Sequence, residues 1–95
     1  MFRITKVFEN SETEIYRVEG KITDEAEQTW SSEITSIVQP THRQIILDFS
    51  QVWFMSQKSI QALTNRVNEK LFLLNCGVEI QNRLIAAGFA PHVLS

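Results

Sequence analysis

Cysteine and histidine are scarce in this chain, which has one cysteine, Cys76, and two histidines, His42 and His92, among its 95 residues. A single cysteine excludes an internal disulfide and any zinc site built on a cysteine pair. The two histidines lie far apart in the sequence, and neither is close to Cys76. We therefore expect no metal site, and we expect Cys76, at the end of an apolar run, to be a small buried hydrophobic residue.

Neither a dominant charge nor a long apolar run is present. The nine basic and eleven acidic residues give a net charge of −2, and the basic residues are scattered. Such a chain lacks the basic surface that binds nucleic acids or anionic membranes. Its strictly apolar runs, such as 45–47 and 71–74, are far shorter than the roughly 20 residues of a membrane span. Residues 1–6 lack the apolar core of a signal peptide, so we predict a cytoplasmic protein with no membrane span.

Glycine is rare as well, and Gly20, Gly77 and Gly88 form neither a phosphate-binding loop nor a dinucleotide-binding motif. We expect these glycines to serve as turns and caps, and we expect no nucleotide or other cofactor. With 43% hydrophobic and 21% charged residues, the composition is that of an ordinary globular domain. The length suits one hydrophobic core, so residues 1–95 are predicted to form a single domain.

The first part of the chain predicts two strands and a helix. Residues 3–8 and 15–20 are rich in β-branched and apolar residues and are separated by a polar cluster, which is typical of an antiparallel strand pair. From Asp24 onward the apolar residues recur at intervals of three and four, which is the pattern of an amphipathic helix. Asp24 is the expected cap of this helix, and Pro40 marks its expected end.

The middle of the chain predicts a central strand and a second helix. Residues 44–49 form a nearly continuous apolar run, which is typical of a strand buried on both faces. Residues 50–55 are expected to cross over to a helix over 56–68, which has apolar residues at positions 60, 63 and 67.

The last part predicts a strand over 71–76 and a helix over 78–87. Gly88 is a good left-handed cap for that helix, and Phe89 is placed to fold back on its last turn. Strands that alternate with helices indicate parallel pairing with right-handed crossovers. The predicted fold class is therefore α/β: a small mixed sheet of about four strands, with an antiparallel N-terminal strand, and about three helices.

Candidate nucleophiles lack a neighbouring base in this sequence. No histidine lies within a few positions of Ser50, Ser56, Ser59 or Cys76. Asp48 ends a predicted strand, as carboxylates that bind Mg²⁺ or accept phosphate do, but no second acidic residue lies near a strand end, which favours a turn-capping role. A small enzyme would need a cleft that joins Asp48, Ser56 and one histidine. We predict no enzymatic activity.

Three large apolar residues, Trp53, Phe54 and Met55, lie at the predicted strand-to-helix junction, where α/β sheets usually bind their ligands. Two interpretations are open: the side chains pack beneath the neighbouring helix, or they stay partly exposed and contact another protein. Ser56 follows as a candidate N-cap. A phosphate on Ser56 would meet free backbone N–H groups and the helix dipole, which makes a phosphorylation switch a second hypothesis for this residue.

Four segments, taken in order, resemble the STAS family, which comprises the anti-sigma-factor antagonists and their relatives. Residues 18–22 read Val-Glu-Gly-Lys-Ile where the family has Leu-x-Gly-x-Leu, and residues 48–52 read Asp-Phe-Ser-Gln-Val where it has Asp-Leu-Ser-x-Val. Residues 53–60 correspond to the family's Thr-Phe-Met-Asp-Ser-Ser-Gly, which opens its second helix. Residues 84–89 match the Leu-x-x-x-Gly-Leu/Phe that ends its final helix. The resemblance covers nearly the whole chain and implies a STAS-like fold.

The resemblance also implies a function. Such domains are cytoplasmic bacterial modules that take part in signal transduction and transcription regulation by partner switching, without enzymatic activity. Their second helix and the loop before it bind a serine-kinase-type anti-sigma factor or a similar regulator. In this chain the residues expected at the contact are Trp53, Phe54, Met55, Gln57, Lys58 and Gln61.

The chain departs from the family pattern at the switch. Ser56 stands where the family has aspartate, Gln57 where it has the phospho-accepting serine, Lys58 where it has the next serine, and Ser59 where it has glycine. Gln57 cannot be phosphorylated, so the usual switch is expected to be absent and the domain to stay in a state that resembles the unphosphorylated form. Lys58 adds a cation that changes the contact face. Ser56 and Ser59 are displaced candidates for phosphorylation.

A second departure is length. Between Ser59 and Leu71 the chain is about two helical turns shorter than is usual for the family, so the second helix is expected to offer a smaller surface. An alternative function is that of a structural or regulatory subunit in a larger transport or sensory complex, a role that STAS-like domains also have. The oligomeric state is left open, and a dimer is one of the alternatives.

Overall fold

The computed structural model describes residues 1–38, 42–65 and 70–94. Within these ranges the chain forms five strands, three α-helices and two short 3₁₀ turns. In chain order the elements are β1 (Phe2–Glu9), β2 (Thr13–Ile22), η1 (Asp24–Ala26), α1 (Glu27–Val38), β3 (Gln44–Met55), α2 (Gln57–Thr64), β4 (Leu71–Leu74), α3 (Val78–Ala86), η2 (Ala90–His92) and β5 (Val93–Leu94).

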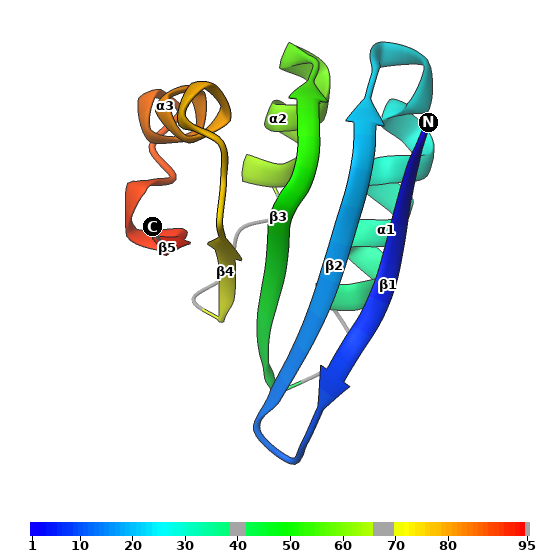
Figure 1. The fold of residues 1–95 in the computed structure, drawn as a ribbon, viewed down its shortest axis with the longest axis vertical. Helices are drawn as coiled ribbons and strands as arrows, with labels where there is room; N and C mark the ends of the chain where they lie inside the picture. Colours follow the sequence, from blue (N-terminus) through cyan, green and yellow to red (C-terminus); the bar gives the residue numbers. More distant parts are fainter. Residues whose placement is uncertain (39–41, 66–69, 95) are drawn as a thin grey trace.

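The strands form one mixed sheet in the order β1-β2-β3-β4-β5. β1 and β2 pair antiparallel, whereas the later pairs are parallel, each with a helix in its crossover. Because each parallel strand is added on the same side of the last, crossovers of one hand place the helices on one face of the sheet. Figure 1 shows α1 and α2 behind the sheet and its front face open. The predicted α/β class is confirmed, with β5 as an additional short strand.

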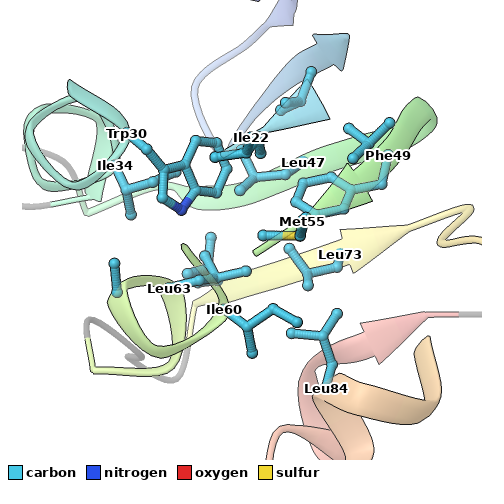
Figure 2. Packing of buried hydrophobic residues seen from close by; sticks show 14 of the residues in the cluster. Ile22, Trp30, Ile34, Leu47, Phe49, Met55, Ile60, Leu63, Leu73 and Leu84 are labelled. Atoms are coloured by element: carbon cyan, nitrogen blue, oxygen red, sulfur yellow. The ribbon is translucent and has the colours of Figure 1, made fainter. Parts of the chain in front are cut away.

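The hydrophobic core lies between the sheet and the helices. It contains the inward-facing residues of β2, β3 and β4 together with the apolar faces of the three helices. Figure 2 shows Met55, Leu73 and Leu84, from three different elements, pointing into the same space. Each fully buried side chain of this size contributes about 1.5–3 kcal/mol to folding, so this single layer of contacts is the main source of stability.

Burial on both faces, which the sequence predicted for the central strand, is wrong. Ile45, Leu47 and Phe49 are buried against the helices, but Ile46 and Asp48 point to the open face and are only partly buried. A single helical layer leaves the other face of the sheet without a cover. The run of apolar residues that suggested a two-sided strand therefore places Ile46 on a half-exposed surface.

The predicted crossover over Ser50–Met55 is also wrong, because these residues continue β3. The register between β2 and β3 shifts twice, and each shift adds one residue to β3. Such β-bulges lengthen the spacing of inward-facing residues, so Phe49, Val52 and Met55 are buried at intervals of three. This part of β3 has no period of two in its sequence, which is why it was not recognised as a strand.

The ends of three predicted elements differ from the sequence analysis. Asp24 does not cap α1, since residues 24–26 form the 3₁₀ turn η1 before the helix begins. β4 ends at Leu74, two residues early, because Asn75 takes up a left-handed backbone conformation with φ 60°. α2 ends at Thr64, before its predicted end at residue 68. Pro40, predicted to mark the end of the first helix, and Val67, predicted to belong to the second, lie outside the described residues.

The C-terminus of α3 is built as predicted. Gly88 has φ +88°, the N–H of Gly88 donates to the carbonyl of Ile85, and the N–H of Phe89 donates to the carbonyl of Leu84, at 3.0 Å each. This is the Schellman arrangement, and it returns Phe89 to the core, where its exposed fraction is 1%. Gly20 is different, since it lies inside β2 and serves neither as a turn nor as a cap.

No helix in the described part of the chain is long and apolar enough to cross a membrane.

Candidate functional site

The second half of β3 presents two adjacent aromatic side chains to solvent. Trp53 is 70% exposed and Phe54 is 43% exposed, whereas Met55 is completely buried. Val52 and Met55 hold the strand to the core on either side of the pair, and the bulge between them turns both aromatic side chains outward. The structure therefore divides the three predicted contact residues: Trp53 and Phe54 are accessible, and Met55 is part of the core beneath them.

A lysine from the neighbouring strand lies on the exposed tryptophan. The ammonium group of Lys21 is 5.4 Å from the centre of the Trp53 ring, and Lys21 is opposite Phe54 in the ladder between β2 and β3. A cation over an indole face is a favourable arrangement worth about 0.5–1 kcal/mol at an exposed site. Lys21 therefore restricts the Trp53 side chain and adds positive charge to its surroundings.

The first turn of α2 is fixed by two serines. Ser56 is the N-cap, and its hydroxyl accepts a hydrogen bond from the N–H of Ser59 at 3.1 Å, as the sequence predicted. The Ser59 hydroxyl donates to the carbonyl of Ser56 at 2.7 Å. Ser59 is completely buried and Ser56 is 8% exposed, so a kinase would reach either hydroxyl only after this turn had opened.

The outer face of the same helix is polar. Gln57, Lys58 and Gln61 are all exposed, and Gln57 and Gln61, which are four positions apart, lie on the same face of the helix. The region 49–64 contains no aspartate or glutamate. We use the name junction surface for these three residues together with Trp53 and Phe54, the five exposed residues at the end of β3 and the start of α2.

Sequence reasoning missed Arg83, which links α3 to this surface. Its guanidinium group donates to the carbonyl of Met55 at 2.6 Å and to the side-chain carbonyl of Gln57 at 3.2 Å. The Met55 carbonyl lies between β3 and α2, so Arg83 fixes the junction from the neighbouring helix. A signal was available, since Arg83 is the single basic residue of the predicted helix 78–87.

Trp30 anchors the same turn from the other side. Its indole N–H donates to the carbonyl of Ser59 at 3.0 Å, and the ring is completely buried. Trp30 also makes edge contacts with Phe2 and Phe49, with ring centres 5.5 and 6.3 Å apart. Figure 2 shows the indole nitrogen on the side of the ring that faces α2. The start of α2 is thus held by α1 and α3 together.

The groups that a small enzyme would need are engaged separately. Asp48 accepts hydrogen bonds from the N–H of Ser50 at 2.9 Å and from the Asn75 side chain at 3.4 Å, which is a turn-capping role. His92 Nδ1 lies 2.9 Å from the carbonyl of Leu71, and neither it nor His42 contacts Ser56 in any hydrogen bond of the described ranges. Burial raises the pKa of the half-buried Cys76 thiol to about 11, which disfavours the thiolate. Among the described residues, no three His, Cys, Asp or Glu side chains lie close enough together to hold a metal ion.

These features define a class of protein: a small mixed-sheet domain with one helical layer and an exposed aromatic pair where the central strand meets its helix. The chain belongs to the STAS domain family, whose model matches residues 5–93. The resemblance found in the sequence motifs is therefore confirmed. None of the curated protein sequences matches the chain.

Solved structures show the same fold. The anti-sigma factor antagonist SpoIIAA in its unphosphorylated form is similar with a TM-score of 0.74 at 20% identity, over 99% of this chain and 86% of that one. The Bacillus cell fate determinant SpoIIAA in the phosphorylated form is similar with a TM-score of 0.70 at 20% identity, over 99% and 89%. A STAS-domain antisigma-factor antagonist from Rhodobacter sphaeroides reaches 0.56 at 22% identity, over 67% and 68%.

Proposed function

We propose that this chain is a non-enzymatic protein-binding module that acts as an anti-sigma-factor antagonist in a cytoplasmic partner-switching system. Its partner is a serine-kinase-type anti-sigma factor or a similar regulator, and the contact is the junction surface. The observation that carries the proposal is the 70% exposure of Trp53. A large aromatic side chain that stays exposed beside a second one is typical of the centre of a protein–protein contact.

The charge of the junction surface indicates the kind of partner. Lys21 lies over the Trp53 ring, Lys58 is exposed on the first turn of α2, and the region 49–64 carries no acidic side chain. Complementary potentials favour association and suppress wrong partners, so the partner is expected to present carboxylates around an apolar pocket that takes the Trp53 ring.

Gln57 supports the proposal that phosphorylation at the family's usual position does not switch this module. It is exposed at the start of α2, where the family's phospho-accepting serine is expected, and its amide is held by Arg83 at 3.2 Å. A glutamine cannot accept phosphate. We therefore expect constitutive binding, with regulation, where it exists, acting on the partner or on the amount of this protein.

Titration calorimetry with the cognate regulator tests the contact. Lys58→Glu is expected to weaken binding about tenfold or more, because the change reverses a charge on the contact face. Trp53→Ala is expected to weaken binding roughly 30-fold, the effect of a typical hot-spot residue.

Matched controls separate the junction surface from general effects. Arg17→Glu makes the same change of charge on an exposed residue of the open sheet face, and Val78→Ala truncates an exposed apolar residue of α3. Both variants should bind as the parent protein does. Unchanged affinity of Lys58→Glu and Trp53→Ala, with both proteins folded by circular dichroism, would remove the proposed contact.

The switch is tested at Gln57. Gln57→Asp places a carboxylate at the position of the family's phosphate group and is expected to weaken binding about tenfold, whereas Gln57→Ser should restore phosphorylation by the cognate kinase. Mass spectrometry of the wild-type protein after incubation with that kinase should find no phosphate. Modification of Ser56 or Ser59 in this experiment would instead establish a displaced switch.

A second candidate, a structural or regulatory subunit of a transport or sensory complex, is favoured by the open face of the sheet. Phe8, Ile15, Ile46 and Phe72 are opposite one another in successive strand pairs and form an apolar row. Phe8 is 46% exposed, and the other three are partly buried. Co-purification of this chain in a large complex, with Phe8→Ser releasing it and Trp53→Ala not doing so, would favour this candidate over the first.

A further inference from the structure

The outer edge of β1 offers unpaired main-chain groups. β1 is the first strand in the sheet order, and within residues 1–38, 42–65 and 70–94 no strand pairs with its outer side. The N–H of Lys21 donates to the carbonyl of Met1 at 3.2 Å, which makes Met1 and Lys21 a hydrogen-bonded pair of the antiparallel ladder. Bonded and non-bonded pairs alternate in such a ladder, so Phe2 and Ile4 direct their N–H and C=O groups away from β2.

A groove lies directly beside this edge. It has a volume of about 850 Å³ and separates β1 from η1 and the first turns of α1. Its lining includes Phe2, Ile4 and Ala26, which are apolar and only partly buried, and Thr29 on the helix side. Figure 1 shows α1 running alongside β1 at this end of the sheet. A free strand edge next to a helix is the geometry that accepts an extended peptide by strand addition.

The helix side of the groove is acidic. The segment 23–38 contains four acidic residues, Asp24, Glu25, Glu27 and Glu33, and no lysine or arginine. Glu25 and Glu33 line the groove itself and are exposed. The strand side carries the α-ammonium group of Met1 and the guanidinium group of Arg3, which lies 3.7 Å from the carboxylate of Glu19. The negative charge that an incoming segment meets is therefore on the helix wall of the groove.

We propose that this groove, which we call the β1 groove, binds an extended basic segment of a partner protein as an additional strand. The main chain of that segment pairs with Phe2 and Ile4. Every second side chain is lysine or arginine, whose aliphatic part lies over Phe2 and Ile4 and whose charged end reaches Glu25 and Glu33. The β1 groove is formed by other residues than the junction surface, so this proposal does not rest on the proposed function.

A second copy of this chain fits the groove less well. The helix-facing residues of β1 before its bulge are Phe2, Ile4 and Lys6, so a second β1 would supply a single cation. The ammonium group of Lys6 is already 2.9 Å from the carboxylate of Glu9. A segment with a cation at every second position matches Glu25 and Glu33 together, which self-pairing does not.

The probe for this proposal is a capped peptide of alternating lysine and valine, as long as the eight residues of β1. Fluorescence anisotropy with the full chain should show saturable binding that weakens as salt rises from about 0.05 M to about 0.3 M. N-methylation of the alternate peptide nitrogens that face β1 should abolish binding, and methylation of the other set should not. In ¹⁵N NMR spectra, the amides of Phe2 and Ile4 should shift and exchange more slowly with solvent when the peptide is bound.

Charge variants complete the test. The double variant Glu25→Lys/Glu33→Lys should bind the peptide at least about tenfold more weakly, whereas Glu79→Lys, the same change on the exposed start of α3, should bind it as the parent protein does. Binding that is insensitive to both methylation patterns, or equal in the double variant and Glu79→Lys, would overturn strand addition at this site. Light scattering that shows a dimer dissociated by the Glu25→Lys/Glu33→Lys change would assign the groove to a second copy and overturn the assignment to a partner.

Discussion

Gly20 sets how closely β1 approaches β2 near the start of the sheet. It lies inside β2 with φ +99°, and a Cβ atom built on it would be 2.4 Å from the carbonyl oxygen of Met1. A left-handed backbone and a main-chain neighbour at that distance both require a residue without a side chain. Gly88 has a similar φ of +88° but nothing within 4 Å of its Cβ position. A side chain at Gly88 would therefore add backbone strain alone, whereas a side chain at Gly20 would add both strain and a steric clash.

Gly20→Ala is expected to lower the free energy of unfolding by about 2–4 kcal/mol, the sum of backbone strain and a displaced β1. Gly88→Ala should cost only the strain, about 1–2 kcal/mol. Thermal and urea unfolding of both variants measure the difference. Equal losses would show that β1 yields to the new methyl group at no cost.

Local signals in the sequence located some residues correctly and others not. Gly88, Phe89 and Ser56 were predicted well, because a left-handed cap and an N-cap depend on neighbours within a few positions. The sequence could not predict that Trp53 is exposed and Met55 buried, because both side chains are large and apolar. Which way each side chain points depends on bulges that form only when β3 pairs with β2. Arg83 was missed because its partners, Met55 and Gln57, are distant in sequence.

At the scale of elements, α2 is the most dependent on its neighbours. It has eight residues, and isolated helices of this length are not stable in water. Its start is held by the Ser56 cap, by the Trp30 indole at the Ser59 carbonyl, and by Arg83 at the junction. The element order was predictable from periodicity, whereas the lengths of β3 and β4 depend on bulges and on the backbone of Asn75.

Ser56→Ala should therefore lower the free energy of unfolding by about 1 kcal/mol, within the usual range of roughly 0.5–2 kcal/mol for a lost N-cap. Ser32→Ala is the matched control, because it makes the same change on an exposed position of α1 and should stay within about 0.5 kcal/mol of the parent protein. Urea unfolding measures both. A neutral Ser56→Ala would mean that Trp30 and Arg83 fix the helix start without the cap.

At the scale of the whole molecule, a charged cluster ties β1, β2 and the start of β3 together at one end of the sheet. The carboxylate of Glu14, with 8% of its side chain exposed, accepts hydrogen bonds from the Tyr16 hydroxyl at 2.6 Å and from Arg43 at 2.8 Å. The Tyr16 hydrogen bond, followed by Arg43, lowers the pKa of Glu14. Burial, followed by the hydrogen bond to Glu14, raises the pKa of Tyr16 to about 12.

A carboxylate whose pKa is lower in the folded state stabilises the protein above its unfolded pKa, and this contribution is lost as the pH falls through the folded pKa. We therefore expect stability to fall below about pH 4.5, the ordinary pKa of glutamate. Glu14→Gln should lower the free energy of unfolding by about 1 kcal/mol at pH 7, and it should flatten this acid limb of the stability curve. Urea unfolding between about pH 3 and about pH 7, a range that spans the titration of glutamate, measures both effects. An unchanged acid limb would show that Glu14 does not titrate differently on folding.

Tyr16 gives a spectroscopic check at the alkaline end, because it is the single tyrosine of the chain. Because folding raises the pKa of Tyr16, its hydroxyl contributes fully to the stability of the folded state below pH 10, the ordinary pKa of tyrosine. This contribution is lost as the pH rises through about 12. Tyrosinate absorbance should therefore report a pKa of about 12 in the folded protein, and the value should fall towards 10 in Glu14→Gln. A titration that does not respond to Glu14→Gln would show that burial alone shifts the hydroxyl.

The two bulges of β3 affect how the sequence of this protein can evolve. The side chains of Val52 and Met55 are buried in the core, whereas those of the two residues between them are largely exposed on the surface. Substitutions at those two positions are expected to leave the core largely undisturbed. Under the proposed function, specificity for a partner can therefore evolve at this point almost independently of stability.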